Sequence, residues 1–194
     1  MNYKLVTHFD LQNWNEFGEK WIDFSKENNL KCVFFGLNLT PEIRSKIIDA
    51  GIEFRNVKDA SSRLKDIADL GENCLVTRMN VFPKVDFSFK ADEFICGFTD
   101  RSIFDILAPI NNIKRRAKTL LILEERIKFE RFLSSNWIFG NSDFWRDFSD
   151  FQNHISSIQG NDFQPFLDIS QNCDDLFINM YASFFSTFKV RIGQ

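Results

Sequence analysis

The amino-terminal half of the chain alternates short apolar runs with amphipathic helical patterns. Apolar runs occupy residues 3–9, 30–36, 52–57 and 74–77, and helical spacing of apolar residues follows each of the first three. The run over 30–36 is almost continuously apolar, which is typical of a strand buried on both faces of a parallel sheet. Strands that alternate with helices at this spacing predict an α/β protein with a mostly parallel or mixed central sheet flanked by helices.

The pattern changes after Pro83. Two further strands are expected at 85–89 and 93–98, the longest helical pattern runs from Asn112 to Leu133, and a final helix is expected near 173–185. A segment rich in Trp and Phe lies at 137–145, where Trp145 is expected to be partly exposed because charged residues surround it. No linker separates these parts, so the sequence predicts one domain over 1–194 with a helical C-terminal part.

Composition and charge narrow the possible classes of protein. The chain has 44% hydrophobic residues and a formal charge of −3, so it can bury a core and lacks the basic excess of a dedicated nucleic-acid binder. No apolar stretch is long enough to span a bilayer, and the first residues show no signal-peptide pattern, which predicts cytoplasmic residence. The four cysteines are widely spaced and are expected to be reduced thiols, mostly in the core.

Candidate ligand-binding residues follow the first and fourth predicted strands. In an open parallel sheet, ligands bind beyond the carboxyl ends of the strands. Thr7, His8 and Asp10 stand at the end of the first strand, and Arg78 and Asn80 follow the fourth. The chain contains neither the glycine fingerprint of dinucleotide-binding folds nor a P-loop, so a phosphorylated ligand must be held by other groups.

Several short blocks, in their order along the chain, resemble small nucleotide-sugar glycosyltransferases of the GT-A fold. These blocks are Thr7–Asp10, Leu75–Asn80, Phe139–Trp145 and Cys173–Asn179. The resemblance implies that the first block meets the nucleotide base and that Gly140 and Asn141 shape the sugar and acceptor pocket. It also implies that the acidic pair Asp174 and Asp175, with Asn179, lies near the reacting sugar carbon.

The chain departs from this family at the metal-binding Asp-x-Asp motif. Asn80 and Phe82 stand at the two acidic positions, and a divalent ion on a diphosphate prefers anionic oxygen ligands. Cationic side chains such as Arg78 can replace the metal, other carboxylates such as Asp86 or Asp174 can hold Mn²⁺ or Mg²⁺, or the protein can be a non-catalytic relative. The sequence leaves these three alternatives open.

Charge is unevenly distributed in the second half of the chain. Between Lys114 and Arg131 there are seven basic and three acidic residues, whereas 141–177 contains seven aspartates and one arginine. The basic segment is either a solvated helix face or a phosphate-binding site in which Lys114 and Arg115 take part. Asp174 and Asp175 either complement a helix N-terminus or assist catalysis.

The leading hypothesis is an enzyme that transfers a sugar from a nucleotide diphosphate sugar to an acceptor hydroxyl. Arg78, with Lys114 or Arg115, would stabilise the leaving diphosphate, and Asp174 would be the carboxylate beside the reacting sugar. The sequence leaves the acceptor open among a glycan, a protein and DNA. The alternative is a catalytically silent GT-A-like module that binds a nucleotide or a protein partner, and the loss of the metal motif favours it.

Overall fold

The computed structural model describes residues 3–58, 63–83, 90–99, 132–157 and 174–192. Its core is one seven-stranded sheet with the strand order β3-β2-β1-β4-β6-β5-β7. The described strands are β1 (Lys4–Phe9), β2 (Cys32–Leu37), β3 (Glu53–Val57), β4 (Cys74–Thr77), β5 (Glu93–Thr99), β6 (Phe132–Gly140) and β7 (Lys189–Ile192). Strand β6 runs antiparallel to both of its neighbours, and every other described pairing is parallel. The predicted α/β class with a mixed central sheet is confirmed.

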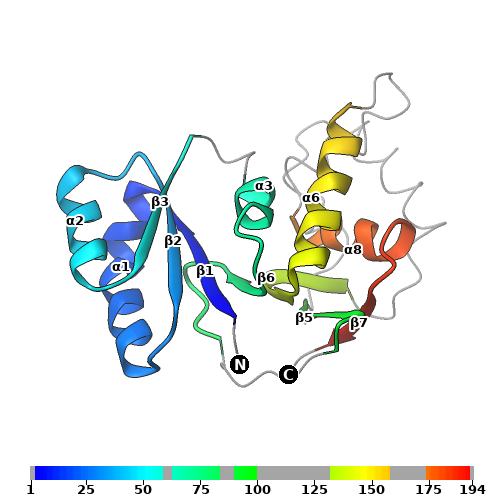
Figure 1. Ribbon diagram of the computed structural model, residues 1–194, viewed down its shortest axis with the longest axis horizontal. Coiled ribbons are helices and arrows are strands. Elements are labelled where there is room, and N and C mark those ends of the chain that lie inside the picture. Colours follow the sequence, from blue (N-terminus) through cyan, green and yellow to red (C-terminus); the bar gives the residue numbers. More distant parts are fainter. Residues whose placement is uncertain (1–2, 59–62, 84–89, 100–131, 158–173, 193–194) are drawn as a thin grey trace.

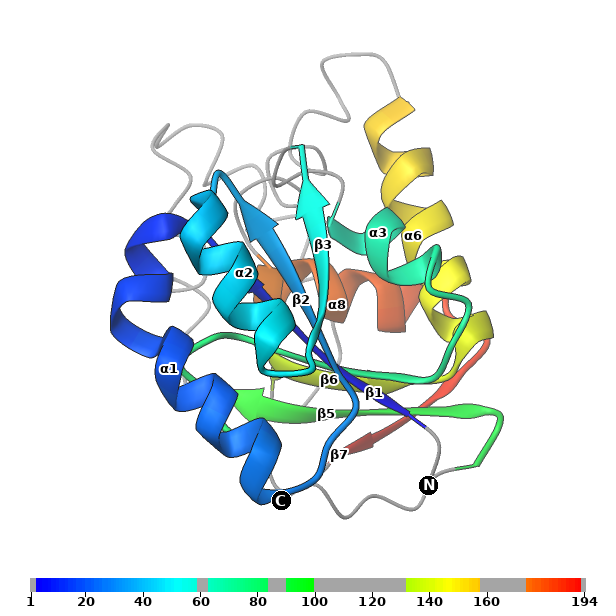
Figure 2. The same cartoon turned by 60° about the vertical axis from the view of Figure 1, so that its left-hand side comes forward.

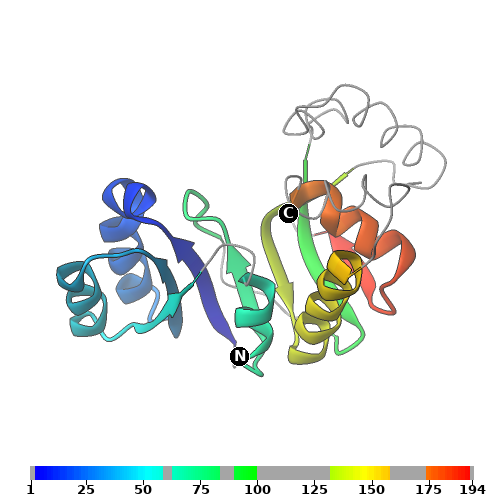
Figure 3. The same ribbon diagram turned by 90° about the horizontal axis from the view of Figure 1, so that it is seen from above.

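Helices cover both faces of this sheet (Figure 1). One face packs against α1 (Leu11–Glu27) and α2 (Pro41–Asp49), and the other packs against α3 (Arg63–Ala68), α6 (Ser142–Ser157) and α8 (Asp174–Phe184). Seen from above, α1 and α2 lie at one end of the molecule, and α6 and α8 lie at the other (Figure 3). The two hydrophobic clusters therefore lie on opposite faces of one sheet.

Local sequence signals explain where the first helices begin and end. Asp10 and Thr40 are N-caps whose side chains accept hydrogen bonds from the backbone of the first turn, and Pro41 occupies the first position of α2. Gly51 and Gly71 follow α2 and α3 at φ values of 77° and 63°, a region that glycine enters without strain. Figure 2 shows α1 and α2 beside β1, β2 and β3, as the βαβ pattern predicted.

In the second half of the chain no separate helix was predicted for α6, and two strands differ from expectation. Leu133 was predicted to end a long helix but belongs to β6, and β7 was not predicted at all. Residues 112–131 of that predicted helix, and the strand expected at 85–89, lie outside the described residues.

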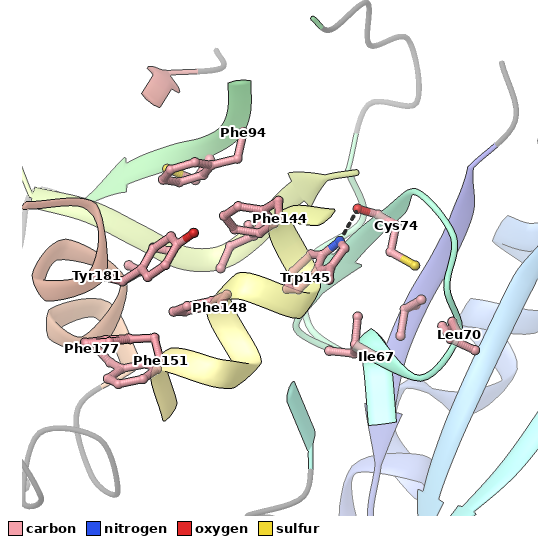
Figure 4. Packing of buried hydrophobic residues seen from close by; sticks show 14 of the residues in the cluster. Ile67, Leu70, Cys74, Phe94, Phe144, Trp145, Phe148, Phe151, Phe177 and Tyr181 are labelled. Carbon is pink, nitrogen blue, oxygen red and sulfur yellow. Dashed lines mark hydrogen bonds between the residues drawn. The ribbon is translucent and has the colours of Figure 1, made fainter. Parts of the chain in front are cut away.

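An aromatic cluster fills the space between the sheet and the two C-terminal helices (Figure 4). Phe94 of β5 stacks on Phe144 at 4.6 Å between ring centroids, and Tyr181 of α8 meets the same ring edge-on at 5.8 Å. Trp145 is 1% exposed, and its Nε1 donates to the carbonyls of Gly140 and Cys74. The prediction that Trp145 is partly exposed is wrong, because this Trp and Phe segment belongs to the core.

The three described cysteines are also core residues. Cys32, Cys74 and Cys96 are buried free thiols, as expected. Burial raises the pKa of each thiol to about 12, so these side chains stay protonated and unreactive near neutral pH. Cys173 lies outside the described residues.

Gly140 is required by the close packing at the junction of β6 and α6. A Cβ atom there would overlap the ring of Phe144, with Cγ at 2.7 Å and Cε1 at 2.8 Å, and that ring is fully buried. Gly140→Ala is therefore expected to lower the free energy of unfolding by about 3 kcal/mol. Urea denaturation measures this change, with Gly97→Ala on β5 as the matched control.

At Gly97 the closest atom to an added Cβ is Trp137 Nε1 at 3.2 Å, so the control is expected to cost about 1 kcal/mol or less. Equal losses of stability in the two variants would show that the Phe144 ring yields to the new methyl group.

Candidate functional site

The loop after β4 is fixed at the edge where the parallel strands end. Arg78 N donates to Asn136 O at 2.8 Å, and Val81 N donates to Arg78 O at 3.0 Å, which closes a tight turn. Thr77 Oγ1 donates to Val81 O at 2.8 Å, and Trp21 Nε1 of α1 donates to Met79 O at 2.6 Å. Contacts from β6 and α1 therefore hold the loop in one conformation.

The two positions of the metal motif lie in this loop and do not fit a divalent ion. Asn80 is exposed and neutral. Phe82 stacks on Trp21 at 4.7 Å between ring centroids and meets Phe24 at 5.3 Å. No group of three His, Cys, Asp or Glu side chains suited to a metal occurs among the residues that the structure describes. One neutral amide and a phenyl ring supply no anionic oxygen, so no metal-dependent step is assigned to these two positions.

Two of the predicted site residues, Arg78 and Asp175, are joined by Ser135. Arg78 Nη2 donates to Ser135 Oγ at 2.8 Å, and Ser135 Oγ donates to Asp175 Oδ1 at 2.7 Å. Ser135 N also donates to Asp175 Oδ1 at 2.7 Å. Arg78 is half-buried, whereas Asp175 is 5% exposed. Strands β4 and β6 and helix α8 therefore meet in one series of hydrogen bonds at the carboxyl end of β4.

These hydrogen bonds form because β6 extends beyond the end of β4. The two strands are paired from Cys74 with Gly140 to Thr77 with Trp137. Helix α8 covers the part of β6 beyond that register: Asn179 Oδ1 accepts from Leu133 N at 2.9 Å, and Asn179 Nδ2 donates to Leu133 O at 3.0 Å. Asp175 and Asn179 lie one helical turn apart on α8. Their side chains bond the backbone groups of β6 that a neighbouring strand would otherwise bond. Asn179, predicted to bind substrate, is fully buried and has a structural role here.

The residues predicted at the end of the first strand have different positions. Strand β1 continues through Phe9, so Thr7 and His8 lie inside the strand and not beyond it. Thr7 is fully buried opposite Thr77, and its Oγ1 has no hydrogen-bond partner in the described residues. Asp10 does lie at the strand end, where Oδ1 accepts from Asn13 N and caps α1.

His8 is held as a neutral imidazole on the face covered by α3. Its ring stacks on Phe35 at 4.8 Å between centroids, and the buried Nε2 has no partner among the described residues. Burial, together with the nearby charge of Arg63, lowers the pKa of His8 well below its ordinary value of 6.5.

The lowered pKa of His8 predicts a pH-dependent stability. Below about pH 6.5 the unfolded chain binds a proton at His8 that the folded protein does not bind, so stability is lost as the pH falls. Each unit of lowering corresponds to about 1.4 kcal/mol. His8→Phe keeps an aromatic ring against Phe35 and is expected to remove much of the loss between about pH 6.5 and 5.

Urea denaturation at several pH values measures this dependence. His154→Phe, at the exposed second histidine, is the control and should leave the dependence in place. A His8→Phe variant with the full wild-type dependence would contradict the assignment to His8.

Gly140 and Asn141 lie at the opposite edge of the sheet from Arg78. Because β6 is antiparallel to β4, its last residue pairs with Cys74, the first residue of β4. Asn141 Oδ1 accepts from Phe144 N at 2.8 Å, and Asn141 Nδ2 donates to Ala91 O at 2.7 Å, so this residue begins α6. The structure does not bring these two residues to the strand ends that hold Arg78 and Asp175.

The structure does not fully describe the remaining predicted residues. Lys114, Arg115 and Asp86 fall outside the described residues, and the structure describes only the backbone of Asp174, the first residue of α8. Ser135 was missed by sequence reasoning. The sequence feature that could have pointed to it is the polar run Ser134–Asn136, which interrupts the apolar residues of this strand.

No protein-family model matches the chain, and no curated protein matches it in sequence. A solved structure that resembles it is glucosyl-3-phosphoglycerate synthase from Mycobacterium tuberculosis in complex with uridine diphosphate. The match covers 84% of this chain and 68% of that chain, with a TM-score of 0.50 and 9% sequence identity. The fold is GT-A-like. At this identity, the likeness to that glycosyltransferase is a distant relationship of fold alone. No described helix of this GT-A-like chain is long and apolar enough to cross a membrane.

Proposed function

We propose that the protein transfers a sugar from a nucleotide diphosphate sugar to an acceptor hydroxyl. The observation that carries the proposal is the hydrogen-bonded chain from Arg78 through Ser135 to Asp175, at the edge where ligands bind in such sheets. The GT-A-like fold supports it, because the structurally similar synthase was solved with uridine diphosphate bound.

The reaction assigns separate tasks to the cationic and acidic residues. The acceptor hydroxyl gives its proton to water as its oxygen bonds to the anomeric carbon. The bond from that carbon to the donor phosphate breaks, and its electron pair leaves on the diphosphate. Arg78 stabilises this charge, with Lys114 or Arg115 as further cations, and Asp174 is the carboxylate beside the sugar. The nature of the acceptor, whether glycan, protein or DNA, stays a prediction. Cytoplasmic residence also stays a prediction.

A second candidate function is a catalytically silent module that binds a nucleotide or a protein partner. The packing of Phe82 on Trp21 favours it, since an aromatic pair now occupies a position that carries a metal-binding carboxylate in the family that the chain resembles. The two candidates differ in turnover and not in fold.

A thermal-shift panel followed by an assay of nucleotide release tests the proposal. UDP-, GDP- and dTDP-sugars are compared with and without Mn²⁺. A donor present at one hundred times its Kd is expected to raise Tm by roughly 5–10 °C. Release of nucleoside diphosphate from the binding donor supports the enzyme. Binding without release supports the silent module, and no shift with any donor contradicts both nucleotide-binding functions.

A further inference from the structure

We propose that the diphosphate of the donor binds at the carboxyl end of β4 without a metal. Arg78 holds the diphosphate, and Asp175 fixes the position of Arg78 through Ser135. The inference rests on the proposed function for the identity of the ligand. It assigns Asp175 as a positioning residue for the phosphate-binding arginine and not as a group that touches the sugar.

The first step is the described part of the loop after β4, residues 78–83, which contains no acidic side chain. Asn80 is neutral, and the exposed ring of Phe82 stacks on Trp21 of α1. The hydrogen bonds at Thr77 Oγ1 and Met79 O fix the backbone between these positions and the sheet. A metal on the diphosphate at this loop would therefore meet an amide and a phenyl ring.

The second step is that the same loop begins with a guanidinium. A planar guanidinium has five N–H donors in a fork that matches phosphate oxygens, and it can bond a protein oxygen and an anion together. Arg78 follows the last residue of β4 directly, and its backbone is bonded to Asn136 of β6. A fixed positive charge therefore lies where a leaving diphosphate needs one.

The third step is how the direction of the guanidinium is fixed. Ser135 donates its hydroxyl proton to Asp175 Oδ1, so the oxygen that faces Arg78 can only accept. Asp175 Oδ1 also accepts from Ser135 N, and its carboxylate is almost fully buried. A buried carboxylate that receives two bonds from one residue is a rigid anchor, and the hydroxyl passes its orientation to Arg78.

The affinities for UDP and for uridine, measured by calorimetry with EDTA or with Mn²⁺, test the inference. If the thermal-shift panel selects a donor with another nucleotide, the diphosphate and the nucleoside of that donor replace UDP and uridine. We expect the Kd for UDP to agree within twofold in the two buffers. Arg78→Ala should weaken UDP at least tenfold and leave uridine unchanged, with Arg78→Lys between it and wild type. Asp175→Asn and Ser135→Ala should weaken UDP roughly threefold to tenfold, and Ser135→Thr, which keeps the hydroxyl, should restore affinity.

Two further variants separate positioning from general damage. The double variant Arg78→Ala with Asp175→Asn should bind UDP no more weakly than Arg78→Ala alone, because Asp175 acts through the arginine. Arg146→Ala, at an exposed arginine of α6 paired with Asp143, is the control and should bind like wild type.

Binding of UDP that is lost in EDTA and restored by Mn²⁺ would overturn the inference and leave the proposed function standing. Equal weakening of UDP and uridine by Arg78→Ala would also overturn it, since the arginine would then not contact phosphate. If no nucleotide binds under any condition, the proposed function fails and the inference fails with it. The comparison of EDTA with Mn²⁺ uses the wild-type protein, so it holds even if a variant does not fold.

Discussion

Replacing Asn179 by leucine is expected to lower the free energy of unfolding by about 3 kcal/mol, or roughly 6–12 °C in Tm. The leucine side chain has a similar volume but cannot bond the N–H and the carbonyl of Leu133, which the amide of Asn179 satisfies in the native protein. Both backbone groups would then be buried without a partner. Each such group costs about 1–3 kcal/mol.

Asn153→Leu is the matched control, because this exposed asparagine of α6 also lies within a helix. It should change stability by about 0.5 kcal/mol or less. If Asn179→Leu instead leaves stability intact and abolishes donor binding, Asn179 contacts substrate, as the family resemblance implied, and the structural role assigned here is wrong.

Replacing Asp174 by asparagine is expected to reduce sugar transfer about a hundredfold, which corresponds to about 2.7 kcal/mol of transition-state stabilisation, while donor affinity stays within twofold. The carboxylate of Asp175 is already bonded twice to Ser135. We therefore propose Asp174, and not Asp175, as the carboxylate beside the reacting sugar. Asparagine keeps the size and capping ability of the side chain and removes only its charge.

Measuring the Kd for the donor and the turnover number separately distinguishes chemistry from binding. Asp143→Asn is the control, since Asp143 is an exposed aspartate in the first turn of α6. Full activity of Asp174→Asn would show that Asp174, like Asp143, only complements a helix N-terminus.

The first half of the fold was predictable because its signals are local. Asp10, Thr40, Pro41 and Gly71 mark helix ends that depend only on neighbouring residues, and β2 is apolar along its length because both of its faces are covered. These features need no knowledge of distant contacts.

The second half depends on contacts between residues far apart in the sequence. Strand β6 is polar at Ser134 and Ser135 because side chains of α8, about forty residues later, satisfy its backbone. Because these contacts are not visible in the sequence, the predicted helix was extended to Leu133, which belongs to β6. Nothing in the local pattern shows that β6 runs antiparallel to β4, so the pairing of Gly140 with Cys74, at the start of β4, could not be predicted.

The site was predictable in part for the same reason. Arg78 follows a strand whose direction the βαβ pattern fixes, so its position at the ligand-binding edge followed from the sequence. The residue that bonds it, Ser135, lies in β6, a strand that was not predicted from the sequence.

A crystal structure of the protein with the best-binding nucleoside diphosphate, grown in EDTA, tests the central claim most directly. The account predicts the nucleotide at the carboxyl ends of β1 and β4, with a phosphate oxygen about 2.7–3.0 Å from the guanidinium of Arg78. It also predicts that the hydrogen bonds from Arg78 to Ser135 and from Ser135 to Asp175 persist in the complex. A diphosphate bound elsewhere, with no contact to Arg78, would contradict the account.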